Sequence, residues 1–156
     1  MLIIGVDPGG TTGICALRPP LELLAVSEEK DRAAVTAWIR LHKPDAVVIE
    51  EFRPHEGLPP WAPLPAPKVI ALLESDERLN VVRQSPSIKR HIPDALLRAA
   101  GLYQVGKPHA NDAIRHAAYY AWLKLGFVQN PEMRDVYARY IENVENSRNK
   151  YYFQNG

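Results

Sequence analysis

The sequence predicts an α/β domain whose mixed sheet has about five strands, the first three antiparallel, with helices on both faces. Three observations predict it: short apolar runs bounded by turn residues, helical stretches between the later runs, and a length of 156 residues, which suits one domain with its own core. The composition, 46% hydrophobic and 24% charged, is that of an ordinary globular protein, which excludes disordered, collagen-like and coiled-coil classes.

Apolar runs predict the strands of the first half. The predicted strands are residues 2–6, 12–17, 21–26 and 46–49. The first run is uninterrupted, as in a strand covered on both faces, and a Pro-Gly-Gly turn follows it. Tight turns between the first three strands predict an antiparallel meander. Ser27 is expected to cap a helix that runs to about residue 42, because an apolar stripe that includes Trp38 follows it.

The second half is mainly helical. Residues 54–67 contain six prolines, which predicts a loop rather than a helix or an inner strand. After this loop we expect helices over residues 68–77, 95–100, 108–125 and 131 to about 144, a short strand at 81–83, and a helical stretch from 85 that breaks at Pro93. We predict a single domain over residues 1–146, followed by a polar and aromatic C-terminal tail at 147–156.

Charge and cysteine content limit the functional class. The single cysteine excludes an intramolecular disulfide and fits a reducing compartment. No apolar run approaches the roughly 18 residues of a membrane-spanning helix, and the N-terminus lacks the features of a signal peptide. The net charge is only +1, but residues 83–124 carry seven Lys and Arg against two acids. This excess fits either nucleic-acid contact or solvated helix faces.

Acidic side chains follow two predicted strands. Asp7 precedes Pro-Gly-Gly-Thr-Thr-Gly, where the glycines allow a phosphate-bearing ligand to approach the backbone and the carboxylate can hold a hard cation. A similar loop occurs in actin-like and sugar-kinase ATPases, and an acid that caps a turn is the simpler alternative. Adjacent strand residues point to opposite faces, so only one of Glu50 and Glu51 can share a side with Asp7, and Glu50 is the better candidate.

A third polar group lies at the start of the predicted helix 108–125. His109 and Asp112 are three residues apart and therefore share a helix face. The positive end of the helix dipole favours an ionised Asp112. The alternative is an acid that only caps the first turn. His116, further along, is expected to be a packing or surface histidine.

Four segments, taken in chain order, resemble the motifs of RuvC-type Holliday-junction resolvases, including phage-type members. The matching segments are Gly5-Val6-Asp7-Pro8-Gly9 with Gly13, Val48-Ile49-Glu50, Pro86-Ser87-Ile88-Lys89 and His109-x-x-Asp112-Ala113. The resemblance covers about residues 1–125, while the proline-rich segment and the helix after Gly126 depart from it. It implies a ribonuclease-H-like fold, a homodimer, and cleavage of four-way DNA junctions in recombination and repair, with 5′-phosphate and 3′-hydroxyl products.

The resemblance also implies roles for individual residues. Asp7, Glu50 and Asp112 match the acidic metal ligands, and His109 stands where many members carry another aspartate. His109 either ligates the metal or orients the attacking water. Lys89 matches the lysine near the scissile strand. The implied cofactor is Mg²⁺ or Mn²⁺, with two ions in each site, since carboxylates suit hard cations that clamp a phosphate. No nucleotide cofactor and no membrane are expected, and the implied location is the cytoplasm of a bacterium or of a phage-infected host.

Further residues are candidates for DNA contact. They are Lys89, Arg90, Phe52, Trp61 and Arg115. Phe52 and Trp61 lie in or beside the proline-rich segment, and we predict that they insert as a wedge that offsets the cost of unstacking a base. The alternative is that they pack against the domain.

The predicted helix 68–77 is a candidate for the dimer interface, through Val69, Ile70, Leu72 and Leu73. A junction has approximate two-fold symmetry, and one small domain carries one metal site, so two copies are the simplest means of making two nicks. The alternative is that these four residues belong to the core of the domain.

Three other functions remain open. The first is a YqgF-like ribonuclease-H-fold nuclease that acts on RNA, which the Pro-Ser-x-x-Lys segment disfavours. The second is an actin-like ATP-binding module, which requires two such domains and a longer chain. The third is a non-catalytic junction-binding protein, which the presence of all the expected site residues disfavours. Cleavage of four-way junctions, linear duplexes and RNA–DNA hybrids distinguishes these functions.

Overall fold

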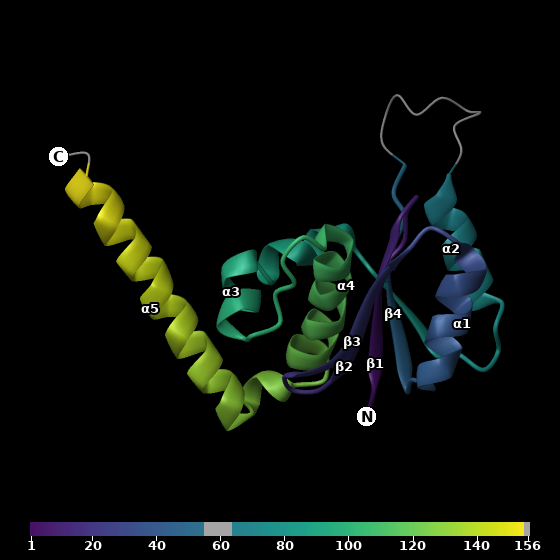
Figure 1. The fold of residues 1–156 in the computed structure, drawn as a ribbon. Helices are drawn as coiled ribbons and strands as arrows, with labels where there is room; N and C mark the ends of the chain where they lie inside the picture. The colour runs from purple at the N-terminus through teal and green to yellow at the C-terminus, as the bar shows by residue number, and fades with distance from the viewer. Residues whose placement is uncertain (55–63, 155–156) are drawn as a thin grey trace.

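One five-stranded mixed sheet forms the centre of the computed structural model, which describes residues 1–54 and 64–154 (Figure 1). Its strands are β1 (Ile3–Asp7), β2 (Thr12–Arg18), β3 (Glu22–Glu29), β4 (Ala46–Glu50) and β5 (Val81–Gln84). The strand order is β3-β2-β1-β4-β5; β1, β2 and β3 are antiparallel, whereas β4 and β5 run parallel to β1. This arrangement confirms the predicted fold class.

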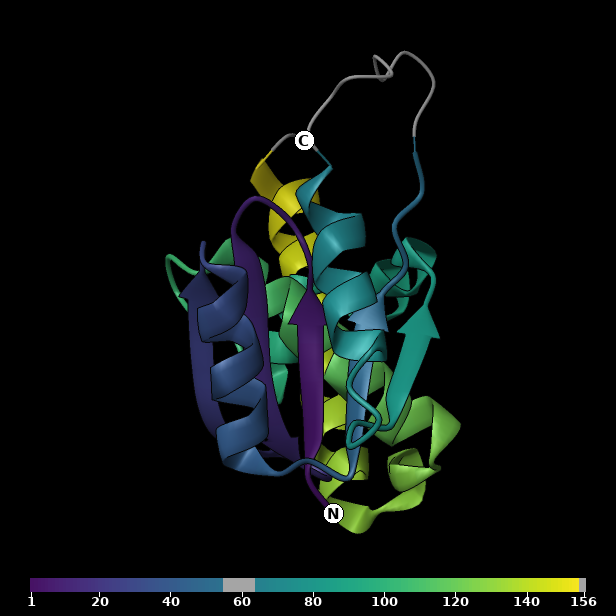
Figure 2. The ribbon, with the colours of Figure 1, turned by 90° about the vertical axis from the view of Figure 1, so that its right-hand side faces the viewer.

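Helices cover both faces of the sheet. They are α1 (Arg32–His42), α2 (Pro65–Glu74), the 3₁₀ turn η1 (Pro86–His91), α3 (Asp94–Ala99), α4 (Pro108–Tyr119), the π-helical turn η2 (Tyr120–Lys124), the 3₁₀ turn η3 (Phe127–Gln129) and α5 (Pro131–Gln154). α1 and α2 lie on one face, and α4, with α3 beyond it, lies on the other (Figures 1 and 2). One apolar core therefore fills each side of the sheet.

The helix that follows β3 begins later than predicted. Ser27 is paired with Ile14 in the β2–β3 ladder, which continues to Glu29. The cap is Asp31, whose Oδ1 accepts a hydrogen bond of 3.0 Å from the backbone N–H of Ala33. Ser27 is a good capping residue, but its place in the strand ladder prevents it from capping the helix.

The bounds of two further helices differ from the prediction. α2 begins at Pro65, inside the predicted proline-rich loop, because prolines are tolerated in the first turn, where the backbone N–H groups have no helical partner. α5 continues to Gln154, through residues predicted to be a tail. Only its first half packs on the domain, through Met133 and Val136, and the rest extends away from the body (Figure 1). The domain boundary at residue 146 stays a prediction.

Two glycines allow the backbone of α4 to lie directly on the sheet. A Cβ atom at Gly5 in β1 would stand 2.0 Å from the carbonyl oxygen of Ala113, and one at Gly13 in β2 would stand 2.0 Å from that of His109. Only a residue without a side chain permits this approach. The first turns of α4 are thereby held beside the end of β1. Within the described ranges 1–54 and 64–154, no helix has the length and apolarity needed to cross a bilayer.

Asp76 connects α1 to the segment between α2 and β5, and we predict a pH-dependent contribution to stability from it. Hydrogen bonds from Arg78 and then Arg40, the Nε atom of each at 2.8 Å, hold the pKa of Asp76 well below its usual range. A lowered pKa in the folded state adds stability that is fully present above the unfolded pKa of 3.8. This stability is lost gradually as the pH falls from there through the lower pKa of the folded state. Asp76→Asn should therefore lower the melting temperature near pH 7 and lower it much less near about pH 2. Thermal unfolding at both pH values measures this; an equal difference at both would contradict it.

Candidate active site

The parallel pairing of β1 and β4 brings two predicted site residues to one edge of the sheet. Val6 is opposite Ile49 in the ladder, so Asp7 and Glu50 leave their strands side by side. Asp7 is opposite Gly13, the residue on which the start of α4 rests. Two acids from the sheet and the first turns of α4 therefore meet at this edge.

A single ammonium group lies among three carboxylates at this edge. Lys89 projects from η1, and its Nζ lies 2.7 Å from Glu50 Oε2, 2.7 Å from Asp112 Oδ2 and 3.6 Å from Asp7 Oδ1. The side chain of His109 borders the cluster, with its Nδ1 3.2 Å from Asp7 Oδ2. The structure therefore brings together the five residues that the motifs single out as catalytic, and we call them the edge cluster.

The edge cluster shifts the pKa values of its members in different directions. Burial, assisted by the nearby Glu50 and Asp112 charges, raises the pKa of Asp7 despite the opposing Lys89 charge. Burial would also raise the pKa of Glu50, but hydrogen bonds from His116 and Lys89 outweigh it and lower that pKa. For Lys89, burial favours the neutral amine, yet hydrogen bonds to Asp112 and Glu50 prevail and raise the pKa. The lysine is therefore fully charged at neutral pH.

We predict that Lys89→Met destabilises the fold, because it leaves three partly buried carboxylates without their shared cation. The free energy of unfolding should fall by about 1–3 kcal/mol, since removing one partner leaves the remaining charges uncompensated. Lys68→Met is the matched control, because Lys68 is exposed and has no acidic partner among the described residues. Urea unfolding without divalent cations compares the two; equal stability would mean that the lysine does not stabilise the cluster.

The predicted DNA-contact residues occupy different environments. Arg115 is largely buried: it pairs with Asp112 and Asp94, and its Nε donates to the carbonyl of Ile92 at 3.0 Å. It therefore braces α4 against η1 and α3 and does not project freely. Arg90, which follows Lys89 in η1, is exposed, and its Nε donates to His91 Nε2 at 3.4 Å. Phe52 is partly buried against the core between the sheet and α2. It therefore packs against the domain, which was the alternative to a DNA wedge. Trp61 lies outside the described residues.

His116 is the polar residue that the sequence interpretation missed. It is fully buried, with Nε2 2.8 Å from Glu50 Oε2 and Nδ1 2.9 Å from Gln84 Oε1. The expectation of a packing or surface histidine gave it no polar role. The available signal was spacing, because His109, Asp112 and His116 follow each other at three and four residues and share one face of α4.

The donor set of the edge cluster suits a hard divalent cation. Three carboxylates from three elements converge on one positive charge, that of Lys89, and Mg²⁺ and Mn²⁺ prefer such oxygen donors. As the described side chains stand, no group of three His, Cys, Asp or Glu is arranged around a metal position. The lysine ammonium is at the point of convergence. The residues therefore fit a metal once this side chain moves away.

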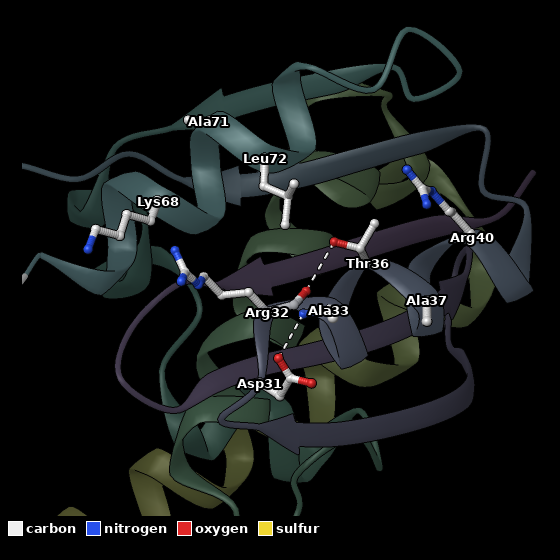
Figure 3. A pocket seen from close by; sticks show the side chains of 9 residues that line it. All are labelled: Asp31, Arg32, Ala33, Thr36, Ala37, Arg40, Lys68, Ala71 and Leu72. Atoms are coloured by element: carbon white, nitrogen blue, oxygen red, sulfur yellow. Dashed lines mark hydrogen bonds between the residues drawn. The ribbon is translucent and has the colours of Figure 1, made fainter.

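A groove of about 810 Å³ lies elsewhere, between α1 and α2 (Figure 3). Most of its polar groups already have partners: Asp31 caps α1, the Thr36 hydroxyl donates to the carbonyl of Arg32, and Arg40 pairs with Asp76. Figure 3 shows the charged ends of Arg32 and Lys68 at one end of the groove, and these two have no acidic partner among the described residues. The groove contains no group with evident catalytic chemistry.

Comparisons with known proteins agree with this fold. No protein-family model matches the sequence, and no curated protein does. Among solved structures, the chain is similar to Thermus thermophilus RuvC in complex with a Holliday junction substrate, at 20% identity and a TM-score of 0.60, over 81% of this chain and 97% of that one. A second structure of Thermus thermophilus RuvC matches at 20% identity and a TM-score of 0.58, over 81% of this chain and 98% of that one.

A viral structure is also similar, at lower sequence identity. Fowlpox virus resolvase, in complex with substrate Holliday junction DNA, matches at 15% identity and a TM-score of 0.57, over 80% of this chain and 99% of that one. Identities this low establish a common fold. The chain therefore has the ribonuclease-H-like fold of RuvC and of the poxvirus resolvase, as its motifs predict.

Proposed function

We propose that the protein is a structure-selective, metal-dependent endonuclease that resolves four-way DNA junctions. It makes paired symmetric nicks and leaves 5′-phosphate and 3′-hydroxyl ends. The observation that carries the proposal is the edge cluster, in which Asp7, Glu50 and Asp112 surround Lys89 at the end of the central strands. Two of the similar solved structures hold junction DNA, which supports this substrate.

The roles follow from the chemistry of each side chain. Asp7, Glu50 and Asp112 would hold Mg²⁺ or Mn²⁺, with two ions in each site. When bound, such ions supply an activated water and stabilise the leaving oxygen of the scissile phosphate. His109 borders Asp7 and is half exposed, so it either joins the ligands or orients the water. Lys89, once released from the carboxylates, would pair with a phosphate of the scissile strand.

DNA contacts are assigned by exposure. Arg90 is exposed and follows Lys89 in η1, so its guanidinium can pair with a phosphate of the bound DNA. Arg115 acts indirectly, because its pairing with Asp112 holds that carboxylate in place. Phe52 and Trp61 remain the candidates for the side chain that opens the junction centre, the first from a partly buried position.

We also propose that the protein acts as a homodimer, in the cytoplasm. Three of the four residues predicted to form the interface on α2 are not available for it. Val69, Ile70 and Leu73 are buried in the core of the same chain. Of the four predicted residues, Leu72 alone is exposed, at 39%. Light scattering should give twice the chain mass of 17.5 kDa. A strict monomer that still makes paired nicks would contradict the dimer.

The deciding experiment compares substrates. The protein is given a four-way junction, a linear duplex of the same sequence and an RNA–DNA hybrid, each with and without Mg²⁺ or Mn²⁺. Metal-dependent cleavage of the junction alone, at symmetric positions, supports the proposal. Cleavage of RNA or of the hybrid would instead establish a YqgF-like ribonuclease, and junction binding without cleavage under any metal would establish a non-catalytic junction-binding protein.

A further inference from the structure

Three side chains form a buried polar chain behind the edge cluster. Gln84, at the end of β5, is opposite Glu50 in the β4–β5 ladder. His116 reaches both from α4: its Nδ1 lies 2.9 Å from Gln84 Oε1, and its Nε2 lies 2.8 Å from Glu50 Oε2. The imidazole is fully buried and Gln84 is 8% exposed, so water contributes little to either. The sheet and α4 therefore enclose a continuous path from Gln84 to Glu50.

The protons of this chain can be assigned from its partners. An ionised carboxylate only accepts hydrogen bonds, so the Nε2 atom of His116 must carry a hydrogen that it donates to Glu50. In a neutral imidazole the Nδ1 atom then accepts, and it needs a donor from Gln84.

The orientation of the Gln84 amide agrees with this assignment once its ends are exchanged. As placed, Gln84 Nε2 is a buried donor without a partner in the described structure, while Oε1 faces His116. Amide oxygen and nitrogen are assigned from their hydrogen bonds, and exchanging them gives His116 Nδ1 its donor and Gln84 Nε2 a partner. The amide oxygen then takes the position without a partner, and an unpaired buried acceptor is more common in proteins than an unpaired buried N–H. The chain then runs in one direction, from Gln84 through His116 to Glu50.

We infer that Gln84 and His116 are positioning residues that hold the Glu50 carboxylate in the orientation needed to bind the divalent cation. This inference rests on the proposed function. Among the described side chains, Glu50 Oε2 has two partners, Lys89 and His116. Lys89 must leave for the cation to bind, so His116 is the partner that stays. A neutral imidazole orients the carboxylate without adding a positive charge that repels the cation.

Mn²⁺ binding, followed by electron paramagnetic resonance, tests the inference without reference to turnover. His116→Leu removes the donor to Glu50 and should weaken Mn²⁺ binding by about 10–100-fold, as loss of a partner behind a ligand does. His116→Gln keeps an N–H donor and should recover most of the affinity. Thr36→Val is the control, since it removes a buried hydroxyl on α1, remote from the edge cluster.

Junction cleavage provides a second readout. His116→Leu should raise the metal concentration for half-maximal cleavage, keep most of the rate at saturating Mn²⁺, and leave junction affinity without metal unchanged. If His116→Leu does not fold, Gln84→Met is used instead, since it keeps the histidine but removes the donor to Nδ1, and about 10-fold weaker Mn²⁺ binding is expected.

Two results separate this inference from the proposed function. If Glu50→Gln weakens Mn²⁺ binding but folded His116→Leu and Gln84→Met bind Mn²⁺ as the wild type does, the positioning role is wrong and the endonuclease assignment stands. If the wild type binds no Mn²⁺ and cuts no junction, both are wrong.

Discussion

Asp7→Asn should abolish cleavage of a four-way junction while the protein still binds it. Asp7 ends the central strand and is the most buried carboxylate of the edge cluster, with 11% of its side chain exposed. Replacing it removes one of three negative charges available to a divalent cation. We expect a rate loss of about 10³-fold or more, since metal-ion stabilisation of a phosphoryl transition state contributes several kcal/mol. Junction affinity should persist, because contacts from Lys and Arg to phosphates supply most of it.

Single-turnover cleavage and a gel-shift titration measure these two quantities. Asp135→Asn on α5 makes the same chemical change at an exposed position outside the edge cluster and should behave as the wild type. Cleavage by Asp7→Asn at the wild-type rate would show that Asp7 is not part of the catalytic machinery. Loss of binding in parallel with cleavage would show that the residue acts on DNA affinity instead.

Gly13→Ala should be among the most destabilising single substitutions in the chain. A Cβ at this position would stand 2.0 Å from the carbonyl oxygen of His109 and 2.7 Å from the backbone nitrogen of Ala110. Backbone atoms cannot rotate away as a side chain would, so the start of α4 must separate from β2. We expect a loss of about 3 kcal/mol or more in the free energy of unfolding, with loss of cleavage because His109 and Asp112 shift from Asp7.

Gly10→Ala provides a matched comparison, because a Cβ there would meet nothing within 4 Å. Urea unfolding should show this variant close to the wild type and Gly13→Ala far below it. If the two variants are equally stable, α4 does not depend on the close contact with β2. A stable Gly13→Ala variant that has lost cleavage would instead limit the effect to the geometry of the site.

The strand pattern made most of the fold predictable, because apolar runs and turn residues act locally. The pairing of Asp7 with Glu50 also followed, since both end buried runs that a parallel pair places at one edge. The start of α1 could not be predicted from the sequence. Ser27 has a side chain suited to capping a helix, but its backbone is paired in the β2–β3 ladder. The polar role of His116 depends on contacts with two strands distant in sequence, which its neighbours on α4 do not reveal.

The position of Lys89 could not be predicted from the sequence either. The family resemblance singled out this residue, but its position among three carboxylates depends on how η1 packs against α4 and the sheet. Periodicity alone carries no information on that packing. The sequence therefore identified the members of the edge cluster, whereas the charge arrangement within it required the structure.

The assembly of the site from distant segments has a consequence for biosynthesis. The contact between His109 and Asp7 joins residues 102 positions apart, and that between His116 and Glu50 spans 66. Closing loops of this length is slow compared with forming local helices, and it requires that α4 already exists. A growing polypeptide on the ribosome therefore carries the strands and their acids long before it carries a complete site. The edge cluster is complete only after α4 has been synthesised and has docked on the sheet.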